Sequence, residues 1–232
     1  MKKKSYYINS TKINVFEKPT DLFQTLYKEE FDKLINGFCI LPGGRTPNML
    51  YDLLAERNKL KFIISDDRLL DNSNNLSNFK NITDILNINN GYPLSYFDEI
   101  NLRGIEYLNS KLTQIKNNNS IDLSILGLGS DSHTASLFPN QKLNFESDNP
   151  GFVIKNGNDN FKRFTLSYEF LLSSNKIIFL VLGKDKSMAL KNILFAQKDS
   201  LLYPAQEFIY NHSNVEIYCD KNATDLIKNK LI

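Results

Sequence analysis

His133 is one of only two histidines in the 232 residues, and its neighbours suit the chemistry of proton transfer. It stands two residues after Asp131 and follows an apolar segment that ends in Gly-Leu-Gly. A neutral imidazole accepts a proton near physiological pH, and a carboxylate beside it can hold the ring in the required orientation. A single histidine is more often structural, but this position favours a general base held by Asp131. The second histidine, His212, lies in no such pattern, and we expect it to be structural.

A second cluster, Gly43-Gly44-Arg45-Thr46-Pro47, has the composition of a turn between a strand and a helix. Glycine permits positive φ angles and a close backbone approach, Thr46 is a good helix cap, and Pro47 suits the first helical position. The free N–H groups at such a helix start attract anions such as phosphate. The same residues would also serve a purely structural turn, so the motif alone leaves both interpretations open.

Three cations could bind an anionic substrate: Arg68 and Lys186, which follow apolar segments, and Arg163, which precedes Phe-Thr-Leu-Ser. Arg68 comes directly after Asp66 and Asp67, and its planar fork of donors suits a carbonyl or anionic oxygen. An exposed local ion pair would explain the same three charges, but a position just after a strand favours a role in a site. Lys186 stands at a helix start, where a cation opposes the helix dipole unless an anion binds there.

Apolar segments alternate along the chain with segments of helical periodicity, which is typical of an α/β protein. Strands are expected at residues 38–41, 61–65, 122–126, 177–182 and 215–219. Helices are expected at 20–34, 47–57, 77–86, 98–116 and 185–195 and from about Asp220, and loops at 71–76, 87–93, 117–120 and 145–160. Strands that are apolar throughout favour a doubly wound, mostly parallel, Rossmann-like sheet with helices on both faces. Ligands bind at the carboxyl ends of such strands, where we expect the clusters to converge.

The composition excludes several classes of protein. The 28 basic and 26 acidic residues are interspersed and give a net charge of +2, which argues against nucleic-acid binding. The longest apolar segment is too short to span a membrane, and the lysine-rich start lacks the apolar core of a signal peptide. Cys39 and Cys219 lie in apolar segments, as expected for reduced thiols of a cytoplasmic protein. No repeat or linker is found, so we expect one domain over residues 1–232.

Neither a metal nor an organic cofactor is expected. No group of His, Cys, Asp and Glu has metal-ligand spacing, and Gly127-Leu128-Gly129 lacks the third glycine of a dinucleotide fingerprint. A serine nucleophile is less favoured than a general base, because the chain has no GxSxG motif.

Taken together, these clusters resemble the 6-phosphogluconolactonase family, which is similar in fold to the glucosamine-6-phosphate deaminases. The resemblance follows nearly the whole chain in order: Leu-Pro-Gly-Gly-Arg-Thr-Pro at 41–47, Ser-Asp-Asp-Arg at 65–68, Ser-Asn at 77–78, Leu-Gly-Leu-Gly-Ser-Asp-Ser at 126–132, Arg-Phe-Thr-Leu-Ser at 163–167, Gly-Lys-Asp-Lys at 183–186 and Tyr-Pro-Ala at 203–205. The most specific element is His-Thr-Ala-Ser-Leu-Phe-Pro at 133–139. The deaminases differ after the histidine and usually carry tyrosine where this chain has Arg68.

The resemblance implies hydrolysis of 6-phospho-D-glucono-1,5-lactone to 6-phosphogluconate in the oxidative pentose phosphate pathway. His133, held by Asp131, would deprotonate the attacking water, and Arg68 with backbone N–H groups of the Gly129–Ser130 turn would stabilise the oxyanion. The substrate and its phosphate would contact the remaining residues, which are Gly43, Gly44, Arg45, Thr46, Asp66, Arg163 and Lys186. The expected partner is this sugar-phosphate lactone, with no nucleic acid or membrane, and the protein would be a monomer or a small homo-oligomer.

Two positions depart from the family pattern. Asp67 stands where the family usually has glutamate, and Ser132 stands where it usually has glycine. If that glycine serves a positive φ, the serine costs about 1 kcal/mol and could displace His133. Ser132 leaves open a sugar-phosphate-binding protein without catalysis. A deaminase or isomerase of amino-sugar phosphates in the same fold is a separate alternative.

Overall fold

The computed structural model describes residues 3–55, 57, 59–71, 73–86, 102–141, 149–155 and 160–231. The strands of its central sheet are β1 (Lys3–Ile8), β2 (Thr11–Phe16), β3 (Gly37–Leu41), β4 (Leu60–Ile64), β6 (Ile121–Gly127), β9 (Ile177–Val181) and β10 (Val215–Asp220). They lie in the order β1-β2-β10-β9-β6-β3-β4. Neighbours are parallel except β1, which is antiparallel to β2. The prediction of a mostly parallel sheet is confirmed.

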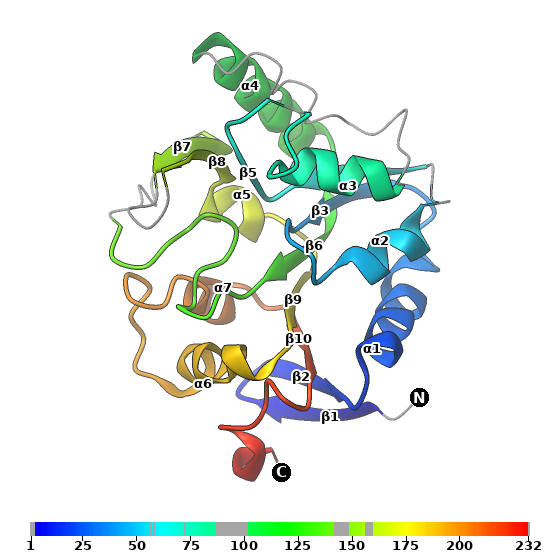
Figure 1. Ribbon diagram of the computed structural model, residues 1–232, viewed down its shortest axis with the longest axis vertical. Helices are drawn as coiled ribbons and strands as arrows, with labels where there is room; N and C mark the ends of the chain where they lie inside the picture. The colour runs from blue at the N-terminus through cyan, green and yellow to red at the C-terminus, as the bar shows by residue number, and fades with distance from the viewer. Residues whose placement is uncertain are drawn as a thin grey trace.

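The helices cover both faces of this sheet. They are α1 (Pro19–Leu26), α2 (Asn48–Leu54), α3 (Asn78–Leu86), α4 (Leu102–Asn118), α5 (Tyr168–Leu172), α6 (Ser187–Phe195) and α7 (Gln206–Asn211), with a π-helical turn η1 (Tyr27–Phe31) and 3₁₀ turns η3 (Lys184–Lys186) and η4 (Lys228–Lys230). Figure 1 shows α1 and α2 on one side of the sheet and α6 and α7 on the other. Because both faces are covered, β9 is buried at every position. Within the described residues, no helix combines the length and apolar character needed to cross a bilayer.

A second, antiparallel sheet begins directly after β4. Its strands are β5 (Asp66–Arg68), β8 (Lys162–Leu166) and β7 (Gly151–Lys155), in the order β5-β8-β7. β7 falls inside the loop expected at residues 145–160, so that prediction is wrong for residues 151–155. This strand lies at the sheet edge, and its exposure alternates along its length. A five-residue alternation next to Gly and Asn is too short to stand out from a loop in the sequence.

The helix expected from about Asp220 is also wrong, because that segment folds into consecutive turns. The Asp220 carboxylate accepts the N–H of Ala223 at 2.9 Å and that of Gly183 at 3.0 Å. The turns close by bonds between residues three apart, such as Ile227 N–H to the carbonyl of Thr224. The Asp220 bond to Ala223 has the geometry of a helix cap, but the bonds that follow it join residues three apart and close single turns in place of an α-helix.

The other expected strands and helices are present, with shifted ends. The helix expected at 20–34 is split into α1 and η1, and the one expected at 185–195 into η3 and α6. The loop at 87–93 and the start of the helix expected from residue 98 lie outside the described residues.

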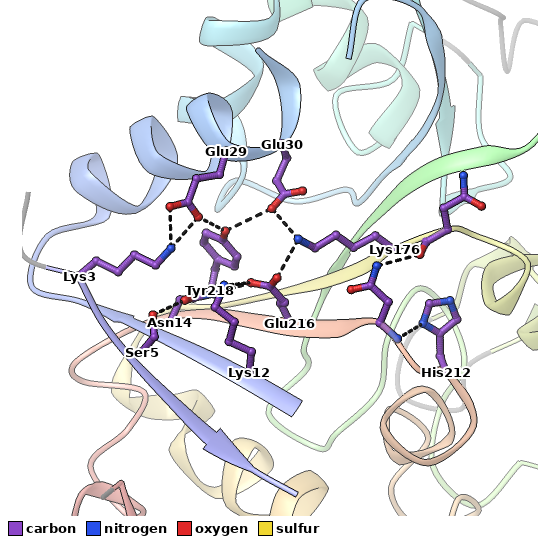
Figure 2. A network of polar contacts seen from close by, with 12 residues as sticks. Lys3, Ser5, Lys12, Asn14, Glu29, Glu30, Lys176, His212, Glu216 and Tyr218 are labelled. Carbon is purple, nitrogen blue, oxygen red and sulfur yellow. Dashed lines mark hydrogen bonds and ion pairs between the residues drawn. The ribbon is translucent and has the colours of Figure 1, made fainter. Parts of the chain in front are cut away.

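A network of charged side chains ties η1 to the central sheet (Figure 2). Lys176, just before β9, lies 2.7 Å from Glu30 and 2.8 Å from Glu216. Lys3 of β1 lies 2.6 Å from Glu29. Lys176 and Glu216 stand at the amino ends of parallel strands, whereas the motifs of the sequence follow the carboxyl ends. The network is therefore a structural feature at the opposite end of the sheet from those motifs.

Candidate active site

A cleft of about 300 Å³ opens at the carboxyl ends of β3, β6 and β9, beside the second sheet. Nine of the eleven residues singled out in the sequence line it: Gly43, Gly44, Thr46, Asp66, Arg68, Gly129, His133, Arg163 and Lys186. Asp131 lies outside this lining but contacts His133. Arg45 is exposed and outside the lining as well. Parallel strands bring these motifs together because their carboxyl ends share one edge.

The His133 ring is held by the carboxylate of Asp131. Its Nδ1 lies 2.5 Å from Asp131 Oδ1, which also accepts the backbone N–H of His133 at 3.1 Å. Burial alone would raise the pKa of the Asp131 carboxyl, but the hydrogen bond and charge of His133 lower it below its usual value. A ring that donates from Nδ1 keeps the lone pair of Nε2 available to accept a proton.

The backbone around this pair is tightly constrained. A Cβ on Gly129 would lie 2.2 Å from His133 Nδ1 and 2.7 Å from Asp131 Oδ1, so only glycine fits there. Ser132 has a φ of 73° and is buried. Its N–H donates to the carbonyl of Gly129, and its carbonyl accepts the N–H of Ala205. The serine thus adopts the left-handed conformation that glycine would serve, at a cost of about 1 kcal/mol.

The Gly129 N–H cannot act in an oxyanion hole as expected. It donates to the carbonyl of His133 at 2.8 Å and so closes the turn that carries the imidazole. A backbone donor that is already used within a turn is not free to bind a substrate oxygen. The two arginines of the cleft are side-chain candidates for that task.

Arg68 and Arg163 lie side by side on neighbouring strands of the second sheet. They are register partners in the antiparallel pair of β5 and β8, and both line the cleft. Arg68 Nη1 donates to the carbonyl of Leu76 at 2.9 Å, and the Arg163 guanidinium lies 5.8 Å from the ring centre of Phe138. Like charges in directly opposite positions destabilise a sheet. A bound anion would relieve this repulsion, so the pair has the character of an anion site.

Asp66 is the acidic member of the cleft. Its buried carboxylate accepts hydroxyl hydrogen bonds from Ser136 at 2.5 Å and from Ser65 at 3.0 Å, and it lies 3.9 Å from Arg163 Nη1. Ser136 therefore holds a carboxylate that faces the cleft.

The turn at residues 43–46 approaches the cleft through its backbone. A Cβ on Gly43 would lie 2.1 Å from side-chain atoms of Asn78, and Gly44 has a φ of 87°. The expected Thr46 cap is wrong: α2 begins at Asn48, and Pro47 precedes it with a non-helical ψ of 1° and no side-chain cap. The Asn48 N–H instead donates to the carbonyl of Arg45, which closes a turn before the helix starts.

Lys186 lies at the end of η3, immediately before α6. Its ammonium is 3.5 Å from the Asp185 carboxylate, and its side chain is 27% exposed. The expectation that it starts a helix holds, with a 3₁₀ turn in place of the first α-helical turn. A half-buried cation at this point adds to the positive charge of the two arginines.

Comparison with known proteins identifies the relatives of this chain. The sequence model of the glucosamine-6-phosphate isomerases/6-phosphogluconolactonase family matches residues 23–217. The chain belongs to this family. The 6-phosphogluconolactonase of Haemophilus influenzae is 30% identical, over 81% of this chain and 86% of the relative. That of Thermotoga maritima is 33% identical, over 72% of this chain and 77% of the relative.

Solved structures show the same fold for this family member. The 6-phosphogluconolactonase of Trypanosoma brucei superposes with a TM-score of 0.77 at 20% identity, covering 95% of this chain and 100% of that one. A monomeric glucosamine-6-phosphate deaminase superposes with a TM-score of 0.75 at 18% identity, covering 92% and 99%. The predicted likeness in fold to the deaminases is confirmed, and because both activities occur on this fold, the fold alone does not select between them.

Two residues that organise the cleft received no role in the sequence analysis. Asn78 lines the cleft and donates from its side chain to the carbonyl of Asp66 at 2.8 Å. The Ser136 hydroxyl donates to the Asp66 carboxylate and so orients it. Both stand in motifs of the family resemblance, which was the available signal. Their partners lie 12 and 70 positions away in the chain, so no local pattern could reveal them.

Proposed function

We propose that the protein is a 6-phosphogluconolactonase, which hydrolyses 6-phospho-D-glucono-1,5-lactone to 6-phosphogluconate in the oxidative pentose phosphate pathway. The observation that carries this proposal is the composition of the cleft. His133 and two arginines from neighbouring strands line it, and Asp131 holds the His133 ring from outside the lining. A base and an anion site are what hydrolysis of an anionic lactone requires. The relatives from Haemophilus influenzae and Thermotoga maritima carry the same name.

In the proposed reaction, His133 acts as general base. Its Nε2 takes a proton from a water molecule whose oxygen attacks the lactone carbonyl, while Asp131 holds Nδ1 and stabilises the imidazolium. Arg68 stabilises the negative charge that develops on the carbonyl oxygen, a contribution of about 3–4 kcal/mol for a preorganised donor. The intermediate then collapses, the bond to the ring oxygen breaks, and the imidazolium returns its proton to that oxygen. The open-chain acid that forms releases its remaining proton to solvent, and the product is the carboxylate.

The phosphate group of the substrate is proposed to bind between the turn at residues 43–46, Arg163 and Lys186. Arginine and lysine form short, charge-assisted hydrogen bonds to phosphate oxygens, and the turn adds backbone donors. Asp66 would accept a hydrogen bond from a sugar hydroxyl, since its carboxylate faces the cleft. We also propose that residues 1–232 act as one domain, in the cytoplasm, without cofactor, and as a monomer or small homo-oligomer.

The first experiment compares the protein with a His133→Ala variant on the lactone. The 1,5-lactone is generated in situ and its disappearance is followed, and only the rate above the spontaneous hydrolysis is counted. Loss of the base is expected to lower kcat about 10²–10⁴-fold. His212→Gln serves as the matched histidine control and is expected to keep kcat, because His212 bonds the Ser174 carbonyl and the Asn214 N–H outside the cleft. A His133→Ala variant as active as the parent would remove His133 as the base.

The same preparation tests the two alternatives. Release of ammonia from glucosamine 6-phosphate would indicate a deaminase. We expect no release, because Arg68 and the sequence after His133 differ from the usual deaminase pattern. Binding of 6-phosphogluconate without any acceleration of lactone hydrolysis would indicate a binding protein without catalysis.

A further inference from the structure

Asp67 is a buried carboxylate in the middle of β5 that does not line the cleft. Side chains alternate along a strand, so Asp66 and Arg68 face the cleft while Asp67 points to the other side. There it meets the start of α3. The exposed fraction of Asp67 is 2%, which makes it one of the most deeply buried charged residues of the described chain.

The Asp67 carboxylate accepts four hydrogen bonds. One oxygen accepts the N–H of Asn78 and that of Arg68, both at 2.7 Å. The other accepts the N–H of Phe79 at 2.8 Å and the hydroxyl of Ser77 at 2.9 Å. The carboxylate therefore joins the backbone of β5 to the first turn of α3, whose N–H groups have no partner within the helix.

Two further bonds join the same pieces of chain on the cleft side. Arg68 Nη1 donates to the carbonyl of Leu76, and the Asn78 side chain donates to the carbonyl of Asp66. Leu76 and Asn78 flank Ser77, which bonds the Asp67 carboxylate directly. The acceptor that orients the Arg68 guanidinium thus belongs to the segment that Asp67 holds in place.

We propose that Asp67 is a positioning residue, which sets the Arg68 guanidinium by anchoring residues 76–79 to β5. This inference rests on the proposed function, since it assigns Arg68 a role in lactone hydrolysis. Asp67 touches no substrate. Its negative charge stabilises the start of α3, and that helix start presents the Leu76 carbonyl and the Asn78 amide to the cleft.

The test uses the full chain with Asp67→Asn, which preserves the shape of the side chain but replaces one acceptor oxygen by a donor. Displacing a substrate-orienting group by about 1 Å can cost about 10²-fold, so kcat/KM is expected to fall about ten- to hundredfold. Urea unfolding run in parallel verifies that the variant is folded under the assay conditions. Asp122→Asn is the matched control, because Asp122 likewise accepts a backbone N–H, that of Phe38 at 3.0 Å, but at the amino end of β6. The kcat/KM of Asp122→Asn is expected to stay within about twofold of the parent value, because Asp122 lies away from the cleft.

A double-mutant cycle separates positioning from a purely structural effect. If Asp67 acts through Arg68, Asp67→Asn lowers kcat/KM less than about threefold when Arg68→Lys is already present, while its effect on unfolding is the same in both backgrounds. If the two effects on kcat/KM simply multiply, the inference is overturned. Should Asp67→Asn not fold, Ser77→Ala removes one of the four bonds, and the same coupling to Arg68→Lys is expected on a smaller scale.

The outcomes distinguish this inference from the proposed function. A parent protein that does not accelerate lactone hydrolysis would overturn both. An active parent whose kcat/KM is unchanged by Asp67→Asn would overturn the positioning role alone.

Discussion

Gly129 packs directly against the side chains of His133 and Asp131, with no room for a Cβ atom. This close packing fixes the geometry of the proposed base. Neither partner can move far: the Gly129 N–H bonds the His133 carbonyl, and the His133 N–H bonds Asp131. Ser132 completes the turn in a left-handed conformation that favours glycine. At the level of single residues, therefore, the position of the imidazole depends on the missing side chain of Gly129 as well as on the hydrogen bonds of the turn.

Gly129→Ala is expected to lower kcat strongly while the fold survives. The new methyl group would overlap His133 Nδ1 and Asp131 Oδ1, so the pair must separate or the turn must shift. A misplaced base costs about 10²-fold in rate. Lactone hydrolysis and thermal unfolding measured on the same preparation test this prediction. It would be contradicted by a folded variant with the kcat of the parent.

At the level of elements, the amino ends of the parallel strands are held by the charged network of Figure 2. η1 contributes Glu29 and Glu30 as consecutive residues, and the sheet contributes Lys176 and Glu216. Burial alone would lower the pKa of Lys176, but its two carboxylate partners raise it above 10.5. Burial alone would raise the pKa of Glu216, but Lys176 holds it below 4.5. Each shift means that the ionised pair stabilises the fold.

The network predicts a specific pH dependence of stability. The contribution of Glu216 is complete above its unfolded pKa near 4.5 and is lost as the pH falls through its lower folded pKa. The contribution of Lys176 is complete below 10.5 and is lost as the pH rises through its higher folded pKa. Lys176→Met is expected to cost about 2 kcal/mol at pH 7 and to flatten the acid limb, because Glu216 loses the contact that does most to lower its pKa. Urea unfolding between pH 3 and pH 7 (about the range of carboxyl titration) measures both effects.

A surface ion pair provides the control for that prediction. Lys116 and Glu169 lie 2.5 Å apart but are 34% and 54% exposed. Lys116→Met is expected to change the free energy of unfolding by less than about 1 kcal/mol and to leave the acid limb unchanged. If both variants behaved alike, the network would contribute no more than an ordinary surface pair.

At the level of the whole molecule, the cleft lies where the central parallel sheet meets the second, antiparallel sheet. Arg68 and Arg163 come from the second sheet, whereas His133 and Lys186 follow strands of the central one. A ligand that contacts both groups would hold the two sheets together. Binding and global stability are therefore coupled by mass action, since the unfolded chain has no such cleft.

6-Phosphogluconate is accordingly expected to raise the melting temperature. At a hundredfold excess over its Kd the folded state gains about 2.7 kcal/mol. Arg163→Ala is expected to abolish most of this shift, and His133→Ala to keep most of it, because the phosphate is proposed to bind Arg163 and not the base. Lys198→Gln is the control, since the exposed Lys198 lies over the ring of Tyr210 outside the cleft. An equal shift in Arg163→Ala and the parent would contradict the assignment of the phosphate.

Most of the architecture could be predicted because it rests on local patterns. Continuous apolar segments such as β9 and periodic ones such as α1 indicated strands and helices, and parallel strands imply that motifs at their carboxyl ends converge. Prediction failed at β7 and after Asp220. An edge strand has only a weak alternating pattern, and the Asp220 carboxylate at the start of the turns also bonds Gly183, which lies 37 positions away.

The amino-acid sequence alone determined three things: which residues could do chemistry, the order of most strands and helices, and the resemblance to a family. Tertiary packing decided which of those residues act together: it set Arg68 opposite Arg163, used the Gly129 N–H inside its own turn and left Arg45 in solvent. It also gave Asp67 its partners at the start of α3. The physical reason is that hydrogen bonds and steric contacts act over a few ångströms, whereas residues that meet in a fold can be far apart in the chain.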